Sequence, residues 1–216
     1  MIVLAIDTAG VDCAVAVYDG AAGRVLGSVS ETIGRGHAER LMAMIDEALD
    51  KAGLTLSEMT RVAVTVGPGS FTGIRVGVAA ARGLALALGV ECVGVSTLSV
   101  LANLPAPGAR RTVLAAMNAH RDEVYAQTFE NGEPCDEARV LGLDVFLSEA
   151  AADNISVIGS ASALLTDRAV QTLPDHFPIE IVAALGAKAK AQGKPKPLYL
   201  RGPDAKPQTG FAVSRA

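Results

Sequence analysis

Short apolar runs alternate with turn residues at the start of the chain. Residues 2–6, 13–18 and 24–30 are rich in Val, Leu, Ile and Ala, and Gly and Asp residues separate them. Runs of this length between such turn residues are typical of β-strands joined by hairpins. The pattern therefore predicts a three-stranded antiparallel meander.

Two helices follow the meander. Over His37–Ala52 apolar residues recur every three or four positions, and Gly53 supplies a stop, which predicts an amphipathic helix. Residues 61–66 have the composition of a buried strand, and a Gly-Pro-Gly turn separates them from a second helix, Phe71–Leu88. This second helix is apolar almost all round, as in a central helix or in one that packs both on its own sheet and on a partner.

The opening of the chain recurs in its second half. Aligning residue 3 with residue 113 matches Val-Leu-Ala to Val-Leu-Ala and Asp12 to Asp122. Chance could produce such a match in a chain rich in Ala and Val, but a hairpin that opens each half is what a duplicated fold requires. We therefore expect two related lobes.

The rest of the pattern predicts four further elements: a helix at 144–151, a strand at Ile155–Ile158, and helices at 161–169 and 181–192. The last of these helices is expected to close the second lobe. A connection rich in Pro and Gly at residues 105–108 marks the boundary between lobes. The predicted division is a first lobe over 1–104, a second lobe over 109–202 and a flexible tail over 203–216.

Composition and charge narrow the class of protein. Half of the 216 residues are hydrophobic, 19% are charged, and the formal net charge is -4. This balance favours a compact α/β protein over a disordered one. It disfavours a protein that holds a nucleic-acid backbone by itself, because phosphate contacts need clustered Lys and Arg. Any role with RNA is expected to run through a partner.

The cysteines and the first residues bear on the compartment. Cys13, Cys92 and Cys135 are odd in number, well separated and free of any Cys-x-x-Cys pair, which favours reduced thiols in the cytoplasm. The chain reaches Asp7 without a basic leader. The apolar stretch at 76–90 is short and carries a charged residue, so we expect no membrane span.

A longer signature follows the predicted strand at 61–66. Gly-Pro-Gly-Ser-Phe-Thr-Gly-Ile-Arg-Val-Gly at residues 67–77 resembles the signature of the TsaB family, also called YeaZ. Four further stretches are similar to the same family, in order along the chain: residues 1–8, 36–39, 123–125 and 197–201. The resemblance spans nearly the whole chain.

This resemblance implies a fold, a function and partners. The fold would be the α/β actin-like ATPase (ribonuclease H-like) fold, with two duplicated lobes that each hold a mixed sheet and flanking helices. The chain would be a non-catalytic subunit of the complex that forms threonylcarbamoyladenosine in tRNA, pairing with and activating a TsaD-type catalytic subunit. A TsaE-type ATPase would be a second partner, tRNA would be reached only through the complex, and the chain alone would form a homodimer.

Two loops could approach a phosphate in this fold class, through backbone N–H groups and a hydroxyl. Their candidate residues are Asp7, Thr8, Gly10, Gly67, Gly69 and Ser70. Asp7 can equally cap a tight turn, and Ser70 can cap the second helix. The matching loop of the second half reads Met-Asn-Ala-His and offers neither a carboxylate nor a glycine, which favours the capping roles.

A required cofactor is therefore not expected, although ATP or ADP at a partner interface stays open. The alternative hypothesis is an autonomous ATPase or phosphotransferase of the same fold, which would use these loops. A third reading, a protease, is disfavoured, because Ser70 does not lie in a Gly-x-Ser-x-Gly pattern and no base marks a triad. We expect no catalytic residue in this chain.

Metal binding on the first helix would need two histidines four positions apart, so that both imidazoles share one face. His37 stands alone, because the position four residues later is Leu41. We interpret His37 as a helix cap or a surface group, and we expect no metal site.

The two predicted helices offer a candidate association surface. Small residues four positions apart let another backbone come close, although full burial inside the monomer explains the same pattern. The resemblance favours association, because TsaB-like proteins are similar in pairing through these helices. The candidate interface residues are His37, Ala38, Leu41, Met42, Ile45, Gly73, Gly77, Ala80 and Leu84. A bulky residue at Gly77 is then expected to abolish pairing and leave the monomer intact.

Overall fold

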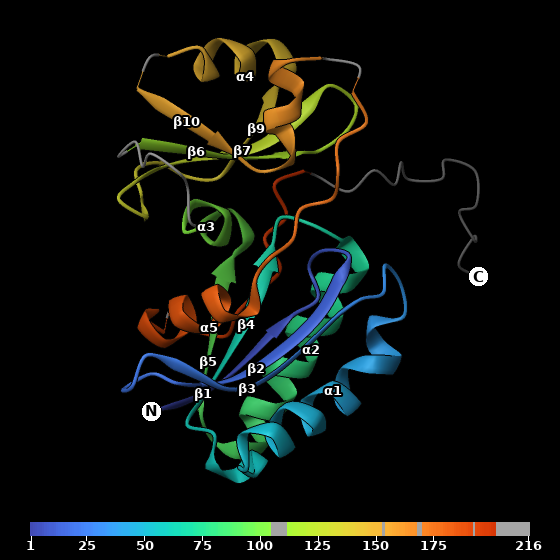
Figure 1. Cartoon of the computed structure of the whole chain (residues 1–216), viewed down its shortest axis with the longest axis vertical. Helices are drawn as coiled ribbons and strands as arrows, with labels where there is room; N and C mark the ends of the chain where they lie inside the picture. The colour runs from blue at the N-terminus through green and yellow to red at the C-terminus, as the bar shows by residue number, and fades with distance from the viewer. Residues whose placement is uncertain (105–111, 153, 168–169, 192, 202–216) are drawn as a thin grey trace, which may run out of the picture.

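The chain folds into two lobes, each built on one β-sheet (Figure 1). The structure, a computed structural model, describes residues 1–104, 112–152, 154–167, 170–191 and 193–201. The predicted boundary connection at 105–108 and the predicted tail at 203–216 lie outside the described residues. Helix α3 (Thr97–Ala102) follows the last strand of the first lobe and contacts strands of both sheets.

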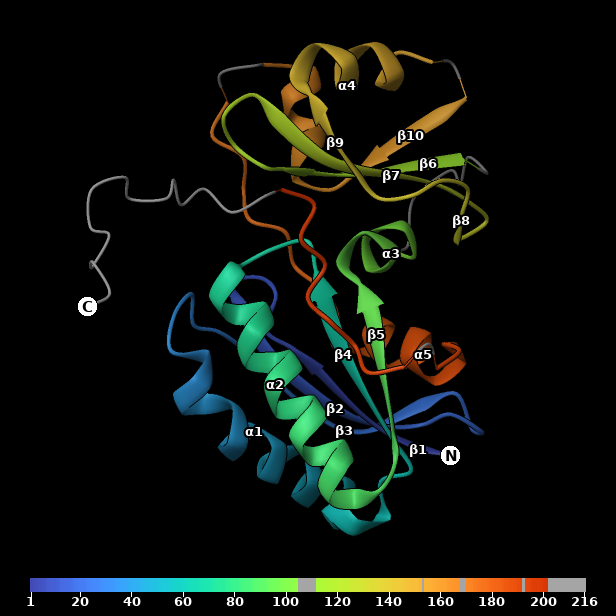
Figure 2. The ribbon, with the colours of Figure 1, turned by 180° about the vertical axis from the view of Figure 1, so that it is seen from behind.

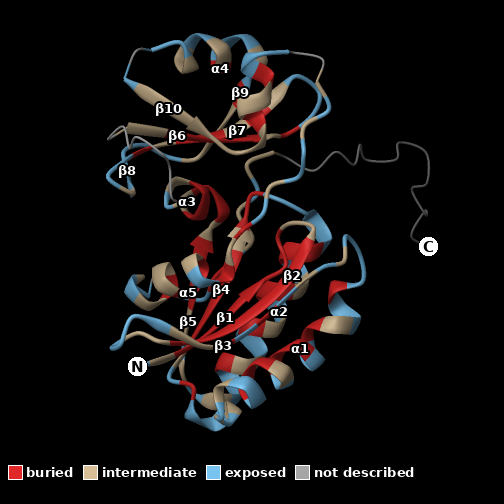
Figure 3. Cartoon of the chain, viewed as in Figure 1, coloured by how far each residue is buried: buried red, intermediate tan, exposed pale blue. Residues whose placement is uncertain are grey.

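The first lobe is a five-stranded mixed sheet in the order β3-β2-β1-β4-β5. Its strands are β1 (Ile2–Asp7), β2 (Asp12–Asp19), β3 (Arg24–Thr32), β4 (Arg61–Gly67) and β5 (Glu91–Ser96). The first three form the predicted antiparallel meander, β4 runs parallel to β1, and β5 runs parallel to β4. The main core lies along the central strands (Figure 3). Helices cover both faces of the sheet, so the side chains of β1, β2 and β4 are buried on both sides, and these strands are nearly continuous apolar runs.

Helices α1 (His37–Ala52) and α2 (Phe71–Leu88) cover one face of this sheet, and they have the bounds that the sequence predicts. A 3₁₀ turn, η1 (Leu56–Glu58), lies between α1 and β4. Figure 2 shows α1 and α2 together in front of the sheet, with α5 (Ile179–Lys188) behind it. The sequence-based assignment of this last helix to the second lobe is therefore wrong, because α5 packs against β1, β2 and β4.

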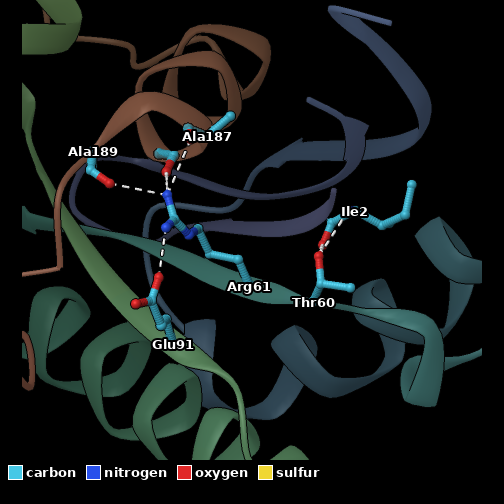
Figure 4. Close-up of polar contacts among 7 residues, drawn as sticks. Ile2, Thr60, Arg61, Glu91, Ala187 and Ala189 are labelled. Carbon is cyan, nitrogen blue, oxygen red and sulfur yellow. Dashed lines mark hydrogen bonds and ion pairs between the residues drawn. The ribbon is translucent and has the colours of Figure 1, made fainter. Parts of the chain in front are cut away.

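Arg61 explains why α5 stays on the first lobe. Its guanidinium on β4 donates hydrogen bonds to the carbonyl oxygens of Gly186, Ala187 and Ala189, at 3.2, 3.1 and 2.9 Å (Figure 4). These carbonyls belong to the end of α5, where no intrahelical partner remains. The same guanidinium pairs with Glu91 on β5 at 2.5 Å, so one side chain joins the sheet to the helix.

The second lobe repeats the start of the first in smaller form. Its strands are β6 (Thr112–Asn118), β7 (Glu123–Glu130), β8 (Glu133–Pro134), β9 (Arg139–Gly142) and β10 (Ile155–Ile158), ordered β10-β6-β7-β8 with β9 also paired to β7. β6 is antiparallel to β7 and parallel to β10, as β1 is antiparallel to β2 and parallel to β4. The two related lobes form the actin-like ATPase fold that the family resemblance implies.

Two helical elements complete the second lobe. Helix α4 (Leu143–Ala150) agrees with the predicted helix at 144–151 to within one residue. The helix predicted at 161–169 is instead a short 3₁₀ segment, η2 (Ser160–Leu165). Among the described residues one helix, α2, is long and apolar enough to cross a membrane by length and composition, and about a third of it is buried in the fold. Its Gly73 and Gly77 are among the buried residues.

Candidate functional site

The polar side chains of the loop between β1 and β2 are buried and hydrogen-bonded within the protein. Asp7 is fully buried, and its Oδ1 accepts hydrogen bonds from the Ala9 amide at 3.0 Å and from the Thr65 hydroxyl at 2.6 Å. The Thr8 hydroxyl donates to the carbonyl oxygen of Gly73 at 2.8 Å. The prediction that Asp7 caps local backbone groups is confirmed, and neither side chain faces solvent.

Burial also changes the acidity of Asp7. Loss of solvation raises the pKa of its carboxyl group to about 6, although hydrogen bonds from Thr65 and Ala9 act in the opposite direction. Oδ2 of Asp7 is buried and has no hydrogen-bond partner among the described residues. A protonated carboxyl group is therefore favoured here at a higher pH than usual.

The Gly-rich turn after β4 lies directly against this loop. The backbone of Gly69 contacts Ala9 so closely that a Cβ there would overlap the Ala9 carbonyl oxygen. A Cβ on Gly73 would overlap the carbonyl oxygen of Thr8 in the same way. Ser70 accepts a hydrogen bond from the Gly73 amide at 3.2 Å, which confirms its predicted role as the cap of α2.

A segment that the sequence analysis did not single out closes over the same loop. The Phe177 ring and the Asp175 carbonyl oxygen each lie 3.1 Å from the point where a Cβ on Gly10 would stand. Phe177 is 3% exposed, and the neighbouring His176 places its Nδ1 at 2.5 Å from Oδ2 of Asp12. Gly10 therefore meets this chain's own residues where a phosphate would otherwise approach.

The corresponding loops of the second lobe are tied to the same segment. The amide and hydroxyl groups of Ser160 donate to the two carboxylate oxygens of Asp175, at 2.7 and 2.5 Å. The Ser160 hydroxyl in turn accepts from the Asn118 amide at 2.9 Å. The Asp175 side chain thus contacts Ser160 of the second lobe, and the His176 side chain contacts Asp12 of the first lobe. No helix or strand pattern marks these residues in the sequence, so their long-range partners could not be inferred from it.

A second connection between the lobes runs along residues 195–201. The Leu198 amide donates to the Val66 carbonyl oxygen at the end of β4, at 2.8 Å. Tyr199 lies with its ring 5.5 Å from that of Phe71, and its hydroxyl accepts from Arg75 Nε at 2.8 Å. The Arg75 guanidinium also lies 3.6 Å above the Phe71 ring.

Arg201 carries this connection onto the second lobe. Its guanidinium forms an ion pair with Glu123 and donates to the carbonyl oxygens of Ala119 and His120. It also lies 6.0 Å from the Tyr125 ring centroid. The stretches at 123–125 and 197–201, which both resemble the TsaB family in sequence, therefore contact each other. We call residues 195–201 the strap.

The predicted interface residues divide into buried and exposed groups. His37, Leu41, Ile45, Gly73 and Gly77 are buried within the first lobe. His37 is 6% exposed and its Nε2 lies 3.1 Å from the Asp12 carbonyl oxygen, so its interpretation as a cap or surface group is wrong. Ala80 and Leu84 are partly exposed, and Ala38 and Met42 are exposed.

The exposed surface of α1 and α2, which we call the outer face, carries apolar side chains among charged ones such as Glu39, Asp46 and Arg75. We define this outer face by its apolar members: Ala38, Met42, Ala43, Phe71, Ala79, Leu86 and Ala87. Met42, Phe71 and Leu86 are 50%, 54% and 78% exposed. Five of the nine interface residues that the sequence predicts are buried within the lobe, so association through the exposed residues stays a prediction.

Metal ligands do not gather at these loops. Across the part of the chain that the structure describes, no group of three or more His, Cys, Asp or Glu side chains is placed to hold a metal ion. His37 contacts a backbone carbonyl oxygen and His176 contacts Asp12.

Comparisons with known proteins agree with this architecture. The sequence model of the TsaD family, described as tRNA N6-adenosine threonylcarbamoyltransferase, matches residues 21–171. The solved structure of YeaZ from Pseudomonas aeruginosa superposes with a TM-score of 0.74 at 30% identity, over 92% of this chain and 99% of that one. This chain belongs to the TsaB (YeaZ) family.

Two curated relatives support the same family. TsaB proteins of Buchnera aphidicola and Escherichia coli are 39% and 38% identical over 125 and 135 residues, or 57% and 62% of this chain. The matches span 58% and 57% of those relatives' own lengths. In this TsaB-family chain, the loops that would hold a nucleotide in the actin-like fold are packed against Phe177 and the turn before α2.

Proposed function

We propose that this chain acts in the formation of threonylcarbamoyladenosine in tRNA as a non-catalytic subunit that pairs with, and activates, a TsaD-type catalytic subunit. The curated TsaB relatives are named for the biosynthesis of that modified nucleoside. The match to the TsaD-family sequence model makes the proposed partner a protein of related sequence. Two related subunits can then pair through equivalent helices.

The observation that carries the proposal is a contrast between two parts of the first lobe. The polar groups of the first loop, Asp7 and Thr8, are buried and hydrogen-bonded within the chain. The outer face instead exposes large apolar side chains, of which Met42, Phe71 and Leu86 are each at least half exposed. Large apolar side chains exposed on two neighbouring helices favour association with a partner protein over catalysis by the first loop.

The assembly that follows from this proposal has further members. A TsaE-type ATPase joins the pair, tRNA is contacted through the complex, and the chain forms a homodimer when it is alone. ATP or ADP, where bound, lies at the interface with the partner. The chain works in the cytoplasm.

Co-purification with the TsaD-type protein of the same organism tests the pairing. Met42→Asp places a charge on the outer face and should weaken the complex at least tenfold, because the loss of a hot-spot side chain in an interface costs about 2 kcal/mol or more. Val145→Asp is the matched control, since Val145 is 53% exposed on α4 of the other lobe. Both variants remove an exposed apolar side chain of the folded protein.

The expected result is a stable wild-type complex, an equally stable Val145→Asp complex and a dissociated Met42→Asp sample by analytical ultracentrifugation. Reconstitution of tRNA modification with TsaD and TsaE should fail in the same variant. A Met42→Asp protein that pairs as tightly as wild type, or a wild type that does not pair, contradicts the proposal.

A further inference from the structure

A cavity of about 500 Å³ lies at the far end of α2 from the phosphate-type loops. Its walls come from the last two turns of α2, the first residues of β5 and the segment just after α5. Figure 2 shows α2 beside β5, with the segment that follows α5 crossing that strand. Its volume is within the range of sites that bind small molecules.

The walls of this cavity are mainly apolar. Ala85, Leu86 and Val90 supply side chains, and glycines supply much of the remaining wall. Gly83 lies inside α2, where glycine is unfavourable relative to alanine. A Cβ built on Gly83 meets no atom within 4 Å, so no close packing explains the glycine. Its missing side chain leaves the cavity open.

The charges at this cavity are positive. Arg82 and Lys194 line it, are exposed, and make no hydrogen bond or ion pair within the described residues. The single carboxylate in the lining, Glu91, is already paired with Arg61 at 2.5 Å. An apolar hollow that carries two unpaired cations complements a molecule with an apolar body and an anionic head.

From this arrangement we propose that the cavity binds a small amphiphilic anion, with its apolar body against Leu86 and Gly83 and its carboxylate or phosphate between Arg82 and Lys194. The site is separate from the phosphate-type loops, and it shares Leu86 with the outer face, so its ligand is tested on the chain without a TsaD-type subunit. Its ligand is a free small molecule, not the surface of a membrane.

Calorimetric titration of the full chain with sodium decanoate, below the concentration at which it forms micelles, tests the proposal. We expect saturable binding of one molecule. Decanol and decyltrimethylammonium, which share the body and lack the negative head, should bind at least tenfold more weakly, and acetate and inorganic phosphate should not bind measurably.

Three variants locate the site. Gly83→Leu fills the cavity from a position with free space and should weaken decanoate binding at least tenfold while the circular dichroism spectrum stays unchanged. The double variant Arg82→Ala/Lys194→Ala should weaken it at least fivefold. Lys188→Ala, the matched control, removes an exposed lysine outside the lining and should bind as wild type does.

Cys92 supplies an independent readout, because its half-buried thiol lines the cavity and Cys135 is the exposed thiol. In a Cys135→Ser background, decanoate should slow alkylation of Cys92 at least threefold, and Gly83→Leu should remove this protection. Absence of saturable binding at millimolar decanoate overturns the proposal. Equal binding by decyltrimethylammonium, unchanged binding by Gly83→Leu, or binding to anionic phospholipid vesicles without binding to free decanoate overturns it as well.

Discussion

Arg201 and Glu123 form an ion pair across 78 positions of sequence, and this pair fastens the end of the strap to the second lobe. At its middle the strap is hydrogen-bonded to the first lobe, because the Leu198 amide donates to the Val66 carbonyl oxygen. The strap therefore spans both lobes beside the N-terminal end of α2. Its Tyr199 also packs on Phe71, a member of the proposed outer face.

Removing this ion pair should loosen the strap. Arg201→Ala is expected to raise the hydrogen-exchange rate of the Leu198 amide at least tenfold, because the strap loses its anchor on the second lobe. The free energy of unfolding should fall by about 1 kcal/mol, the usual contribution of a hydrogen-bonded charge at a partly exposed site.

Arg139→Ala is the matched control for this prediction. Arg139 is also partly exposed and pairs with Asp136 and Glu149 inside the second lobe, so its loss should leave exchange at Leu198 unchanged. Equal exchange rates in wild type and Arg201→Ala would mean that the strap is held from the first lobe alone.

Two glycines of α2 should respond to alanine in opposite directions. A Cβ on Gly77 would overlap the Thr8 hydroxyl and stand 3.3 Å from a methyl group of Val64, so Gly77→Ala should destabilise the fold by roughly 1–3 kcal/mol. Gly83→Ala meets no atom and should stabilise the helix by up to about 1 kcal/mol. Urea unfolding of both variants measures the difference.

The sequence predicts that a bulky residue at Gly77 abolishes pairing and leaves the monomer folded. The structure gives a different expectation, because Gly77 faces the first loop inside the lobe. Loss of pairing in such a variant would therefore report unfolding. A Gly77→Ala protein as stable as wild type would show that the first loop can move away from α2.

The sequence predicts local elements well where their ends are marked. Helices α1 and α2 have the predicted bounds, because Gly53 and Gly89 end them in the left-handed conformation and Ser70 caps the second. Strand β5 was not predicted. Two of its six residues are exposed, two are partly exposed, and one of the exposed residues is a glycine, so its pattern is weak.

Long-range placement could not be read from the same pattern. The apolar pattern of α5 predicts that this helix covers a sheet, but it does not say which one. In the structure α5 buries Ile179, Val182 and Ala183, and Arg61 binds the carbonyl oxygens at its end. Small residues on α2 fitted burial and association equally well. Gly73 and Gly77 are buried against the first loop, which confirms burial for these two glycines, and Ala79 and Ala87 are exposed, so association through them stays a prediction.

Asp7 should make stability depend on pH in an unusual direction. Its pKa of about 6 lies above the ordinary value for aspartate because of burial, so the folded chain binds this proton more tightly than the unfolded chain does. The contribution of Asp7 to the free energy of unfolding should therefore be present in full below about pH 4 and be lost as the pH rises through about 6, a change of at most roughly 3 kcal/mol.

Comparison with Asp7→Asn isolates this effect, because asparagine cannot ionise and its Oδ1 can still accept from Ala9 and Thr65. Urea unfolding at pH 4 and pH 7.5 should show that the free energy of unfolding of the variant rises relative to that of wild type at the higher pH. Asp19→Asn is the control, since hydrogen bonds from the Ala22 and Ala21 amides lower the pKa of Asp19, so its difference from wild type should stay nearly constant between these two pH values. A constant difference between Asp7→Asn and wild type would show that Asp7 does not titrate in this range.

The packing of the first loop also predicts the outcome of an assay for ATP turnover by the chain alone. A phosphate at Gly10 would have to displace Phe177, which is 3% exposed, and a metal ion at Asp7 would have to enter a fully buried site. Removing a buried aromatic ring costs about 3–5 kcal/mol, so such displacement is rare at equilibrium. We expect phosphate release no faster than the protein-free blank, and no change in Asp7→Ala. Turnover that the Asp7→Ala change abolishes would instead identify this chain as an ATPase or phosphotransferase in its own right, with a loop that opens in solution.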